Sequence, residues 1–270
     1  MTLSLDARQR AMLAAMGVRV WQPTTAVQPT PAAQPMARPP QTAPSPAVPA
    51  STATPNIARK ALPADLAEMD WSALQNAASE CQACGLCETR QRSVFSNASS
   101  KTQPPSTDWL IVTDPPSVEE ERRGELFVNA EGELFDAMLL ALGMSRQAAE
   151  GQKVATVVPV LKCRVPEKRN PHAEELAQCR AYLERQVALL EPQVIIAMGR
   201  WAVQSVLSPT SPETALLPLG KLRGQTHRFA NTPVVVTYHP AYLLRSPADK
   251  ARAWSDLCLA IGSLNEPGSA

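Results

Sequence analysis

Four short apolar runs, rich in β-branched residues, restrict the fold of this chain more than any other feature of its sequence. They cover residues 109–113, 154–161, 194–198 and 234–238. Runs of this length and composition are typical of parallel strands that are buried on both faces. Segments with the apolar spacing of helices cover residues 134–142, 173–190, 201–207 and 247–261. This alternation predicts a three-layer α/β/α domain around a central, mainly parallel four-stranded sheet.

The residues that follow each predicted strand are the first place to look for function, because open α/β sheets bind ligands at the carboxyl ends of their strands. In chain order these residues read TDPPS, KCRVP, GRWA and HPAYLLR. A further helix is expected at residues 71–80, where Asp70 can cap the first turn. This helix leads into the cysteine-rich sequence CQACGLC.

Composition along the chain indicates one folded domain. Eleven of the 26 prolines lie between Pro23 and Pro63, among Ala, Thr, Gln and Ser. Such a segment buries too little apolar surface to offset its ordering entropy. We therefore expect a disordered linker at residues 23–63, a folded domain at 64–264 and a disordered tail at 265–270.

Residues 1–22 are expected to form a separate partner-binding peptide, in which Gly17 ends a short amphipathic helix. Two interpretations are open, since this peptide could dock on the folded domain or fold on a partner. The long linker favours a partner. The apolar residues expected to make the contact are Leu5, Met12, Leu13, Met16 and Trp21.

Hydropathy and charge exclude a membrane-spanning protein. The sequence has no run of 18 or more apolar residues, and its N-terminus carries Asp6, Arg8 and Arg10 where a signal peptide would be apolar. We therefore expect a soluble, cytoplasmic protein. The net charge of +1 does not by itself indicate nucleic acid. An acidic stretch at residues 119–136 and basic clusters at 162–169 and 221–228 are interpreted as solvated faces unless other evidence points to DNA.

Six cysteines in a cytoplasmic chain favour metal ligation over structural disulfides. The candidate ligands are Cys81, Cys84, Cys163 and Cys179. Four thiolates from two segments suit either a [4Fe–4S] cluster or a structural zinc ion. Cys87 leaves a second ligand set open, in which CxxCxxC supplies three ligands. Cys258, in the last predicted helix, is expected to be a small buried hydrophobe.

Four sequence blocks carry a family resemblance. They are CQACGLCETR, GELFVNAEGELFDAMLLALG, KCRVPEKRNPHAEELAQCRAYLERQVALLEPQVIIAMGRWA and TYHPAYLLR. In this order, between residues 71 and 262, they resemble family 4 of the uracil-DNA glycosylases, the family that contains an iron–sulfur cluster. The resemblance implies an enzyme that flips uracil out of DNA and breaks its glycosidic bond. It also implies a [4Fe–4S] cluster held by Cys81, Cys84, Cys163 and Cys179, without Cys87.

The resemblance implies roles for several residues of this chain. Phe127 would stack on the flipped base, His239 would hydrogen-bond the leaving uracil anion, and Asp114 would be the catalytic carboxylate. The loop expected to enter the minor groove carries Leu243, Leu244 and Arg245. Phosphate contacts are expected from Lys162, Arg164, Arg169 and Arg223. Without the resemblance, Phe127 would be a core residue and His239 the cap of a strand end.

Three departures from the family pattern weaken the expected uracil site. The sequence TDPPS, at residues 113–117, stands where the family has GEAPG, so a shorter carboxylate remains at Asp114 and both glycines are absent. Pro159 stands where the family has an Asn that pairs with uracil, and proline offers neither a polar side chain nor an N–H. Lys168 also stands where the family motif has Asn.

The N-terminal sequence LDARQRAMLAAMGVRVW carries a second resemblance. It is similar to the N-terminus of the psi subunit of the bacterial DNA polymerase III clamp loader. That subunit uses such a segment to bind the clamp-loader ATPase subunits, so the resemblance implies clamp-loader subunits as partners.

Two functions follow from the sequence. The first is a non-catalytic or weakly active adaptor in DNA replication and repair, tethered to the clamp loader by residues 1–22. The second is an active family 4 uracil-DNA glycosylase that excises uracil from DNA in base excision repair. Pro159 separates the two best, and it favours the adaptor.

Overall fold

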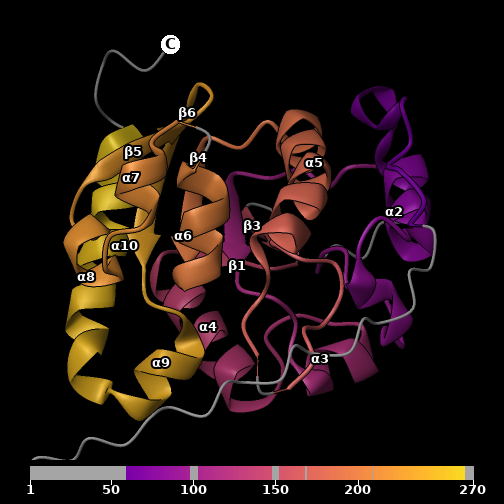
Figure 1. Cartoon of the computed structure of the whole chain (residues 1–270). Coiled ribbons are helices and arrows are strands. Elements are labelled where there is room, and N and C mark those ends of the chain that lie inside the picture. The colour runs from indigo at the N-terminus through magenta and orange to yellow at the C-terminus, as the bar shows by residue number, and fades with distance from the viewer. Residues whose placement is uncertain (1–58, 98–102, 148–151, 168, 209, 265–270) are drawn as a thin grey trace, which may run out of the picture. The chain divides into compact units, whose positions relative to one another are not determined.

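An α/β/α sandwich is formed by the residues that the computed structural model describes, which are 59–97, 103–147, 152–167, 169–208 and 210–264 (Figure 1). The predicted peptide at residues 1–22, most of the predicted linker and the tail at 265–270 lie outside the described residues. Among the described helices, none has the length and apolar character needed to cross a membrane.

A six-stranded sheet forms the centre of the fold, in the order β2-β3-β1-β4-β6-β5. Neighbouring strands run parallel except β5 and β6, which are antiparallel. The strands are β1 (Trp109–Thr113), β2 (Met144–Ser145), β3 (Lys153–Pro159), β4 (Val194–Met198), β5 (Thr226–Phe229) and β6 (Thr232–Thr237).

The mainly parallel α/β/α architecture is confirmed, but the predicted number of strands is wrong. β1 and β4 have the predicted bounds, whereas β3 ends at Pro159, two residues earlier than expected. The two additional strands, β2 and β5, lie at the edges of the sheet, and most residues of β5 are exposed or half-buried. Edge strands lack the continuous apolar run of a strand that is buried on both faces, so their sequences do not predict them in this way.

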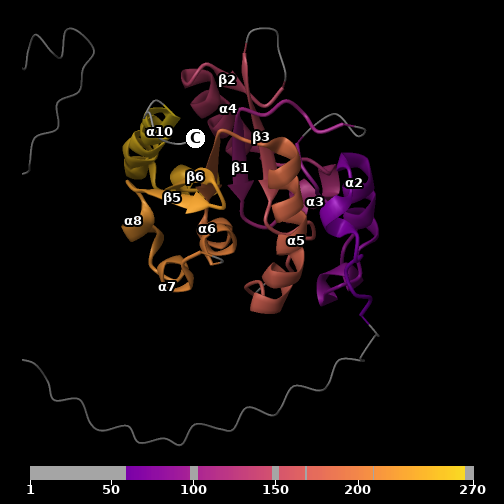
Figure 2. The ribbon, with the colours of Figure 1, turned by 90° about the horizontal axis from the view of Figure 1, so that it is seen from above.

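Helices cover both faces of the sheet. They are α2 (Trp71–Glu80), α3 (Val118–Arg123), α4 (Asn129–Ala141), α5 (Ala173–Leu190), α6 (Arg200–Leu207), α7 (Pro212–Ala215), α8 (Leu219–Leu222), α9 (Pro240–Arg245) and α10 (Lys250–Leu264), with short 3-10 turns η1 (Leu66–Glu68), η2 (Gly85–Glu88) and η3 (Pro247–Asp249). The predicted cap of α2 is confirmed, because the Asp70 carboxylate accepts a hydrogen bond of 2.8 Å from the N–H of Ala73. Viewed from above, α5 and α6 lie on one side of the sheet and α4 and α10 on the other (Figure 2).

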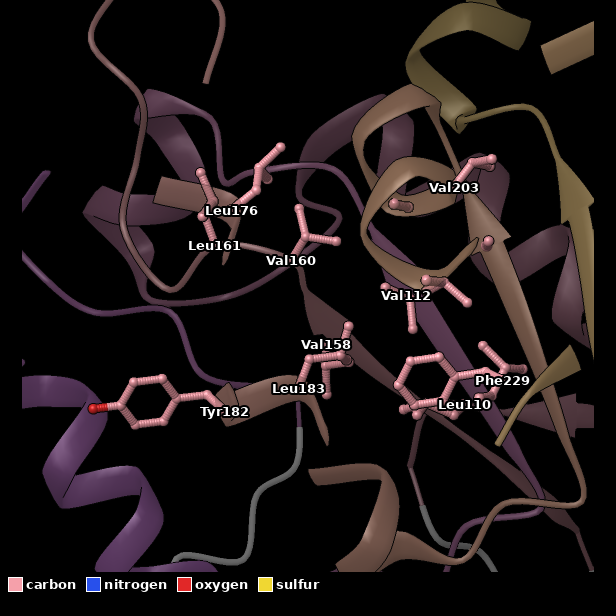
Figure 3. Close-up of a cluster of buried hydrophobic side chains, with 14 of the residues drawn as sticks. Leu110, Val112, Val158, Val160, Leu161, Leu176, Tyr182, Leu183, Val203 and Phe229 are labelled. Carbon is pink, nitrogen blue, oxygen red and sulfur yellow. The ribbon is translucent and has the colours of Figure 1, made fainter. Parts of the chain in front are cut away.

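Side-chain alternation along the strands divides the core into two clusters. Leu110 and Val112 of β1 pack with side chains of α5 and α6, as Figure 3 shows, and this cluster also takes in Trp71 of α2. Trp109 and Ile111 point the other way and pack with side chains of α4 and α10. Both faces of each central strand are therefore buried, as the apolar runs predicted.

The turn between β4 and α6 requires glycine, and Gly199→Ala tests this requirement. Gly199 has a φ of +104°, and an added Cβ would lie 2.3 Å from Oδ2 of Asp114. We expect the variant to lose at least about 2 kcal/mol of unfolding free energy in chemical denaturation, from backbone strain and from the clash. Gly262→Ala in α10, where nothing lies within 4 Å, is the control and should be neutral or slightly stabilising. Equal behaviour of the two variants would contradict the close approach.

Candidate active site at the carboxyl edge of the sheet

The last residues of four parallel strands lie side by side and form one edge of the sheet. Thr113 of β1 is in register with Pro159 of β3 on one side and with Met198 of β4 on the other. Met198 is in turn in register with Thr237 of β6. Residues in register on parallel strands point to the same face, so Thr113, Pro159 and Met198 share the face that α4 covers.

His239, two residues beyond β6, brings a hydrogen-bond donor to this edge. Its Nδ1 accepts a hydrogen bond of 3.2 Å from the N–H of Ala241, at the start of α9. Its Nε2 lies 3.0 Å from Oγ1 of Thr113, so the neutral ring carries its proton on Nε2 and donates it to Thr113. Burial, and to a lesser extent the charge of Arg245, lowers the pKa of His239 to about 4. The imidazole is therefore a neutral donor at physiological pH.

Phe127 lies beside this histidine. Its ring centroid is 5.3 Å from that of His239 and 4.4 Å from that of Phe135. The side chain is buried, and the backbone has a φ of +52°, which is rare for a residue with a side chain. The family resemblance predicted that Phe127 and His239 belong to one site, and in the structure their two rings lie side by side.

Asp114 is positioned by its contacts with α6. The first residues of α6 have no cap of their own, because Gly199 stands at the N-cap. Oδ1 of Asp114 accepts hydrogen bonds from the N–H groups of Trp201 (2.8 Å) and Ala202 (3.0 Å). Burial raises the pKa of Asp114 to about 6, and the hydrogen bonds from α6 oppose the rise. The carboxylate thus holds the end of α6 beside the site, and its catalytic role remains a prediction.

Pro159 leaves an apolar surface at the end of β3. It is buried, on the same face as Thr113. Its carbonyl oxygen, the polar group that remains, accepts a hydrogen bond of 2.7 Å from Nζ of Lys162. This part of the site therefore presents no side-chain donor or acceptor to a ligand.

Lys162 does not have the position predicted for it. Its side chain is 2% exposed, lies 5.7 Å from the ring centroid of Phe95, and donates to the carbonyl of Pro159. Burial lowers the pKa of Lys162 to about 8. A buried ammonium of this kind cannot reach a phosphate, so the interpretation of Lys162 as a phosphate contact is wrong in this structure.

The three arginines that were predicted to meet phosphates form ion pairs within the protein. The pairs are Arg164–Glu121 (2.9 Å), Arg169–Glu175 (2.7 Å) and Arg223–Asp256 (2.7 Å). In each pair the carboxylate is buried, whereas the arginine keeps part of its surface exposed. Phosphate contacts from these residues remain predictions, and Lys168 lies outside the described residues.

The segment predicted to be a minor-groove loop is the short helix α9. Leu243 is buried at 1% exposure and packs inside the protein, so it is not available as a wedge in this structure. Leu244 and Arg245 are exposed and remain candidates for contact with DNA.

Five of the six cysteines gather on the opposite face of the sheet from Phe127. One cavity is lined by Cys81, Cys84, Cys87, Cys163 and Cys179. Burial raises the pKa of Cys163 to about 11 and that of Cys179 to about 12. Cys258 is exposed on α10, so the expectation that it is buried is wrong.

Hydrogen-bond donors point at two of these sulfur atoms. Nη1 of Arg90 lies 3.5 Å from Sγ of Cys163, and the backbone N–H of Lys162 donates to Sγ of Cys179 at 3.3 Å. A cavity with several thiols and donors to sulfur fits a thiolate-bound metal cluster. Within the described ranges, however, no three His, Cys, Asp or Glu side chains converge closely enough to be assigned as a metal site. The geometry also leaves Cys87 as an alternative ligand.

Three contacts that complete these sites were not predicted from the sequence. They are the Thr113 hydroxyl beside His239, Arg90 beside Cys163, and the Glu120 carboxylate beside the N–H of Phe127. The sequence did carry one signal for the last of them, since Ser117 and Glu120 form the S-x-x-E pattern of a helix capping box. That pattern predicts α3, which the apolar spacing missed.

Comparison with known proteins identifies the family. The uracil DNA glycosylase superfamily matches residues 100–258, and the chain belongs to this superfamily. The chain is 30% identical to the Type-4 uracil-DNA glycosylase of Pyrobaculum aerophilum over 72% of its own length and 94% of that protein. It is 29% identical to the Type-4 enzymes of Archaeoglobus fulgidus (65% of this chain, 84% of the relative) and Thermotoga maritima (64% and 82%).

The raised pKa of Asp114 predicts a pH-dependent effect of Asp114→Asn. The folded-state pKa is about 6 and the ordinary value is 3.8. As the pH rises, the Asp114 carboxyl group loses its proton at a lower pH in the unfolded chain than in the folded protein. The contribution of Asp114 to the free energy of unfolding therefore falls between about pH 4 and about pH 6. Asn keeps an oxygen that can accept from the N–H groups of α6, but it does not titrate, so its contribution to stability does not depend on pH in this way. Relative to wild type, the variant should therefore gain stability across that window in thermal unfolding. Asp65→Asn, at an exposed position, is the control, and a pH-independent difference for Asp114→Asn would contradict the assignment.

Proposed function

We propose that this protein is a uracil-DNA glycosylase that removes uracil from DNA during repair. The observation that carries the proposal is the neutral Nε2–H of His239, held beside Phe127 and Thr113 at the carboxyl edge of the sheet. The relatives named Type-4 uracil-DNA glycosylases support this function over the adaptor that Pro159 alone had favoured.

The site supports cleavage by stabilising the leaving base. The bond between the sugar C1′ and the base nitrogen breaks with its electron pair moving onto uracil, and water then adds to the sugar carbon and releases a proton. The developing negative charge on a uracil oxygen would accept a hydrogen bond from Nε2 of His239. For this, the base oxygen replaces Oγ1 of Thr113 as the acceptor. A pKa of about 4 keeps the ring neutral, so it donates a hydrogen bond and keeps its proton.

Phe127 would support one face of the flipped base, and because this residue is 1% exposed, the side chains around it have to move to admit the base. Pro159 limits how the base edge is recognised. Flipped bases are held by stacking together with hydrogen bonds to their edge. Here Pro159 supplies no edge contact, so we expect weak discrimination and slow excision relative to a site with an amide at this position.

His239→Ala and Pro159→Asn test the proposed chemistry in opposite directions. In single-turnover excision from single-stranded uracil DNA, His239→Ala should lower the rate by roughly 10²- to 10³-fold, the usual effect of losing a donor to a developing anion. Pro159→Asn should raise the rate by roughly tenfold or more by restoring an edge contact. The control is His227→Ala, since His227 lies on β5, away from the site, where its Nε2 contacts the carbonyl of Leu222 in α8. Absence of excision by the wild type under all conditions, or excision by His239→Ala at the wild-type rate, would refute the proposal.

We further propose a [4Fe–4S] cluster in the cysteine cavity, with Cys81, Cys84, Cys163 and Cys179 as its ligands. The shared cavity and the two donors to sulfur support this ligand set. When bound, such a cluster cross-links its ligand segments and can carry an electron. Here those segments are the turn after α2, the loop after β3, and α5.

The cluster proposal predicts which cysteines are needed. Anaerobically purified protein should absorb broadly near about 400 nm and carry about four irons per chain. Single Ala substitutions at Cys81, Cys84, Cys163 or Cys179 should each remove the colour and most of the iron. Cys87→Ala, which alters another residue of the same cavity, and Cys258→Ala, on the surface, should retain both. Bound zinc without iron, or loss of iron in Cys87→Ala, would contradict the assignment.

Clamp-loader binding through residues 1–22 remains a prediction. The anchors Leu5, Met12, Leu13, Met16 and Trp21 lie outside the described residues. Their proposed role rests on the sequence resemblance, and it is compatible with an active glycosylase domain at the other end of the chain.

A further inference from the structure

Three consecutive glutamates of α3 have three different environments, although the sequence suggested one solvated acidic face. Glu119 is on the surface and pairs with Arg122 and Arg123. Glu120 and Glu121 are 6% and 2% exposed. Buried carboxylates are costly unless they are paired or hydrogen-bonded, so the contacts of these two residues decide what they do.

Glu120 holds the backbone of Phe127. Its Oε1 accepts a hydrogen bond of 2.6 Å from the N–H of Phe127, and its Oε2 accepts one of 2.8 Å from the N–H of Ser117. The second bond belongs to the capping box of α3, which fixes the orientation of the carboxylate. A rigid acceptor is thus aimed at a residue whose φ of +52° is unfavourable by itself.

The carbonyl side of Phe127 is held as well. Nη1 of Arg146 donates to the carbonyl of Leu126 at 2.8 Å and lies 3.4 Å from that of Phe127. An added Cβ at Gly132 would lie 2.0 Å from the carbonyl oxygen of Phe127, so the backbone of Phe127 is packed against α4. The Phe127 ring is therefore placed by its backbone contacts, in addition to the packing of the ring.

Glu121 connects the same helix to the segments that carry the cysteines. Its Oε2 accepts a hydrogen bond of 2.9 Å from Nε of Arg164, the residue that follows Cys163. Its Oε1 accepts one of 3.1 Å from the N–H of Gln91, which follows Arg90 beside the same cysteine. One turn of α3 therefore contacts the backbone of Phe127 through one carboxylate and the cysteine segments through the next.

We infer that Glu120 is a positioning residue that holds Phe127 in its orientation beside His239, and that Glu121 anchors α3 to the cysteine segments so that this orientation is maintained. The inference rests on the proposed function only in treating Phe127 as the base-stacking residue. The placement of the Phe127 backbone by α3 is a structural property that can be measured without activity.

Hydrogen–deuterium exchange of the full-length protein tests the placement directly. Glu120→Ala removes both acceptors and should speed exchange of the Phe127 amide by at least about tenfold, since hydrogen bonds to charged groups are among the stronger ones. Ser117→Ala weakens the capping box without removing the acceptor of the Phe127 amide, and Glu119→Ala alters the exposed neighbour. Both are matched controls that should leave this amide protected. Glu120→Gln keeps the side-chain volume but can accept from only one of the two amides, so the amide of Phe127 or Ser117 should lose protection. Unchanged protection of both amides in the Glu120 variants would overturn the inference.

A double-mutant cycle tests whether Glu120 acts through Phe127. In single-turnover excision, Glu120→Ala should slow the reaction by about tenfold while the Kd for uracil DNA stays unchanged. In a Phe127→Ala background the same substitution should cause no further loss, because its target is gone. Additive losses, or an equal loss in Glu119→Ala, would overturn a positioning role. If the wild type does not excise uracil, the proposed function fails, and the exchange experiment still decides the placement of Phe127.

Glu121→Ala tests the anchor, because it removes the acceptors of Arg164 and of Gln91 together. It should speed exchange at the amide of Gln91 and, through the loosened helix, at the amide of Phe127. Faster exchange at Gln91 with full protection at Phe127 would overturn the proposed link between the cysteine segments and the site.

Discussion

The central strands are buried on both faces, and this constraint decides where polar chemistry is found in the protein. β1, β3 and β4 are covered by α5 and α6 on one side and by α4 and α10 on the other. A polar side chain in the middle of these strands loses its contact with water and needs a partner inside the protein, as Thr156 of β3 has in Thr107. Three hydrogen-bonding side chains, Thr113, Asp114 and His239, lie where the strands end, and the candidate site forms there.

The two faces of the sheet carry different chemistry. The face under α4 and α10 holds Phe127 and the apolar surface around it. The opposite face, under α5, holds the cysteine cavity. The strands between the two regions present mainly apolar side chains to both faces. Helix α3 has polar contacts with both regions, and its buried glutamates give the connection that the sheet does not.

Four buried charged side chains each have a hydrogen-bonding partner inside the protein. Glu121, Glu175 and Asp256 each pair with an arginine, and Lys162 donates to a backbone carbonyl. Removing one partner of such a pair leaves the other unpaired in a medium of low dielectric constant, which is strongly destabilising. These residues therefore fix the packing of loops around the site, although in the sequence they resemble ordinary surface charges.

The sequence by itself determined the features that depend on local pattern. It predicted the bounds of β1, β4 and α5, the cap at Asp70 and the family, because apolar runs, helical spacing and motif order are readable over a few residues. Tertiary structure decided what the polar residues do. Asp114 caps a helix 87 residues away, His239 finds its partner 126 residues away, and Lys162 is buried beside the ring of Phe95 from a distant segment. The partner and the burial of a charged or polar side chain depend on segments distant in the chain, and only the folded structure brings those segments together.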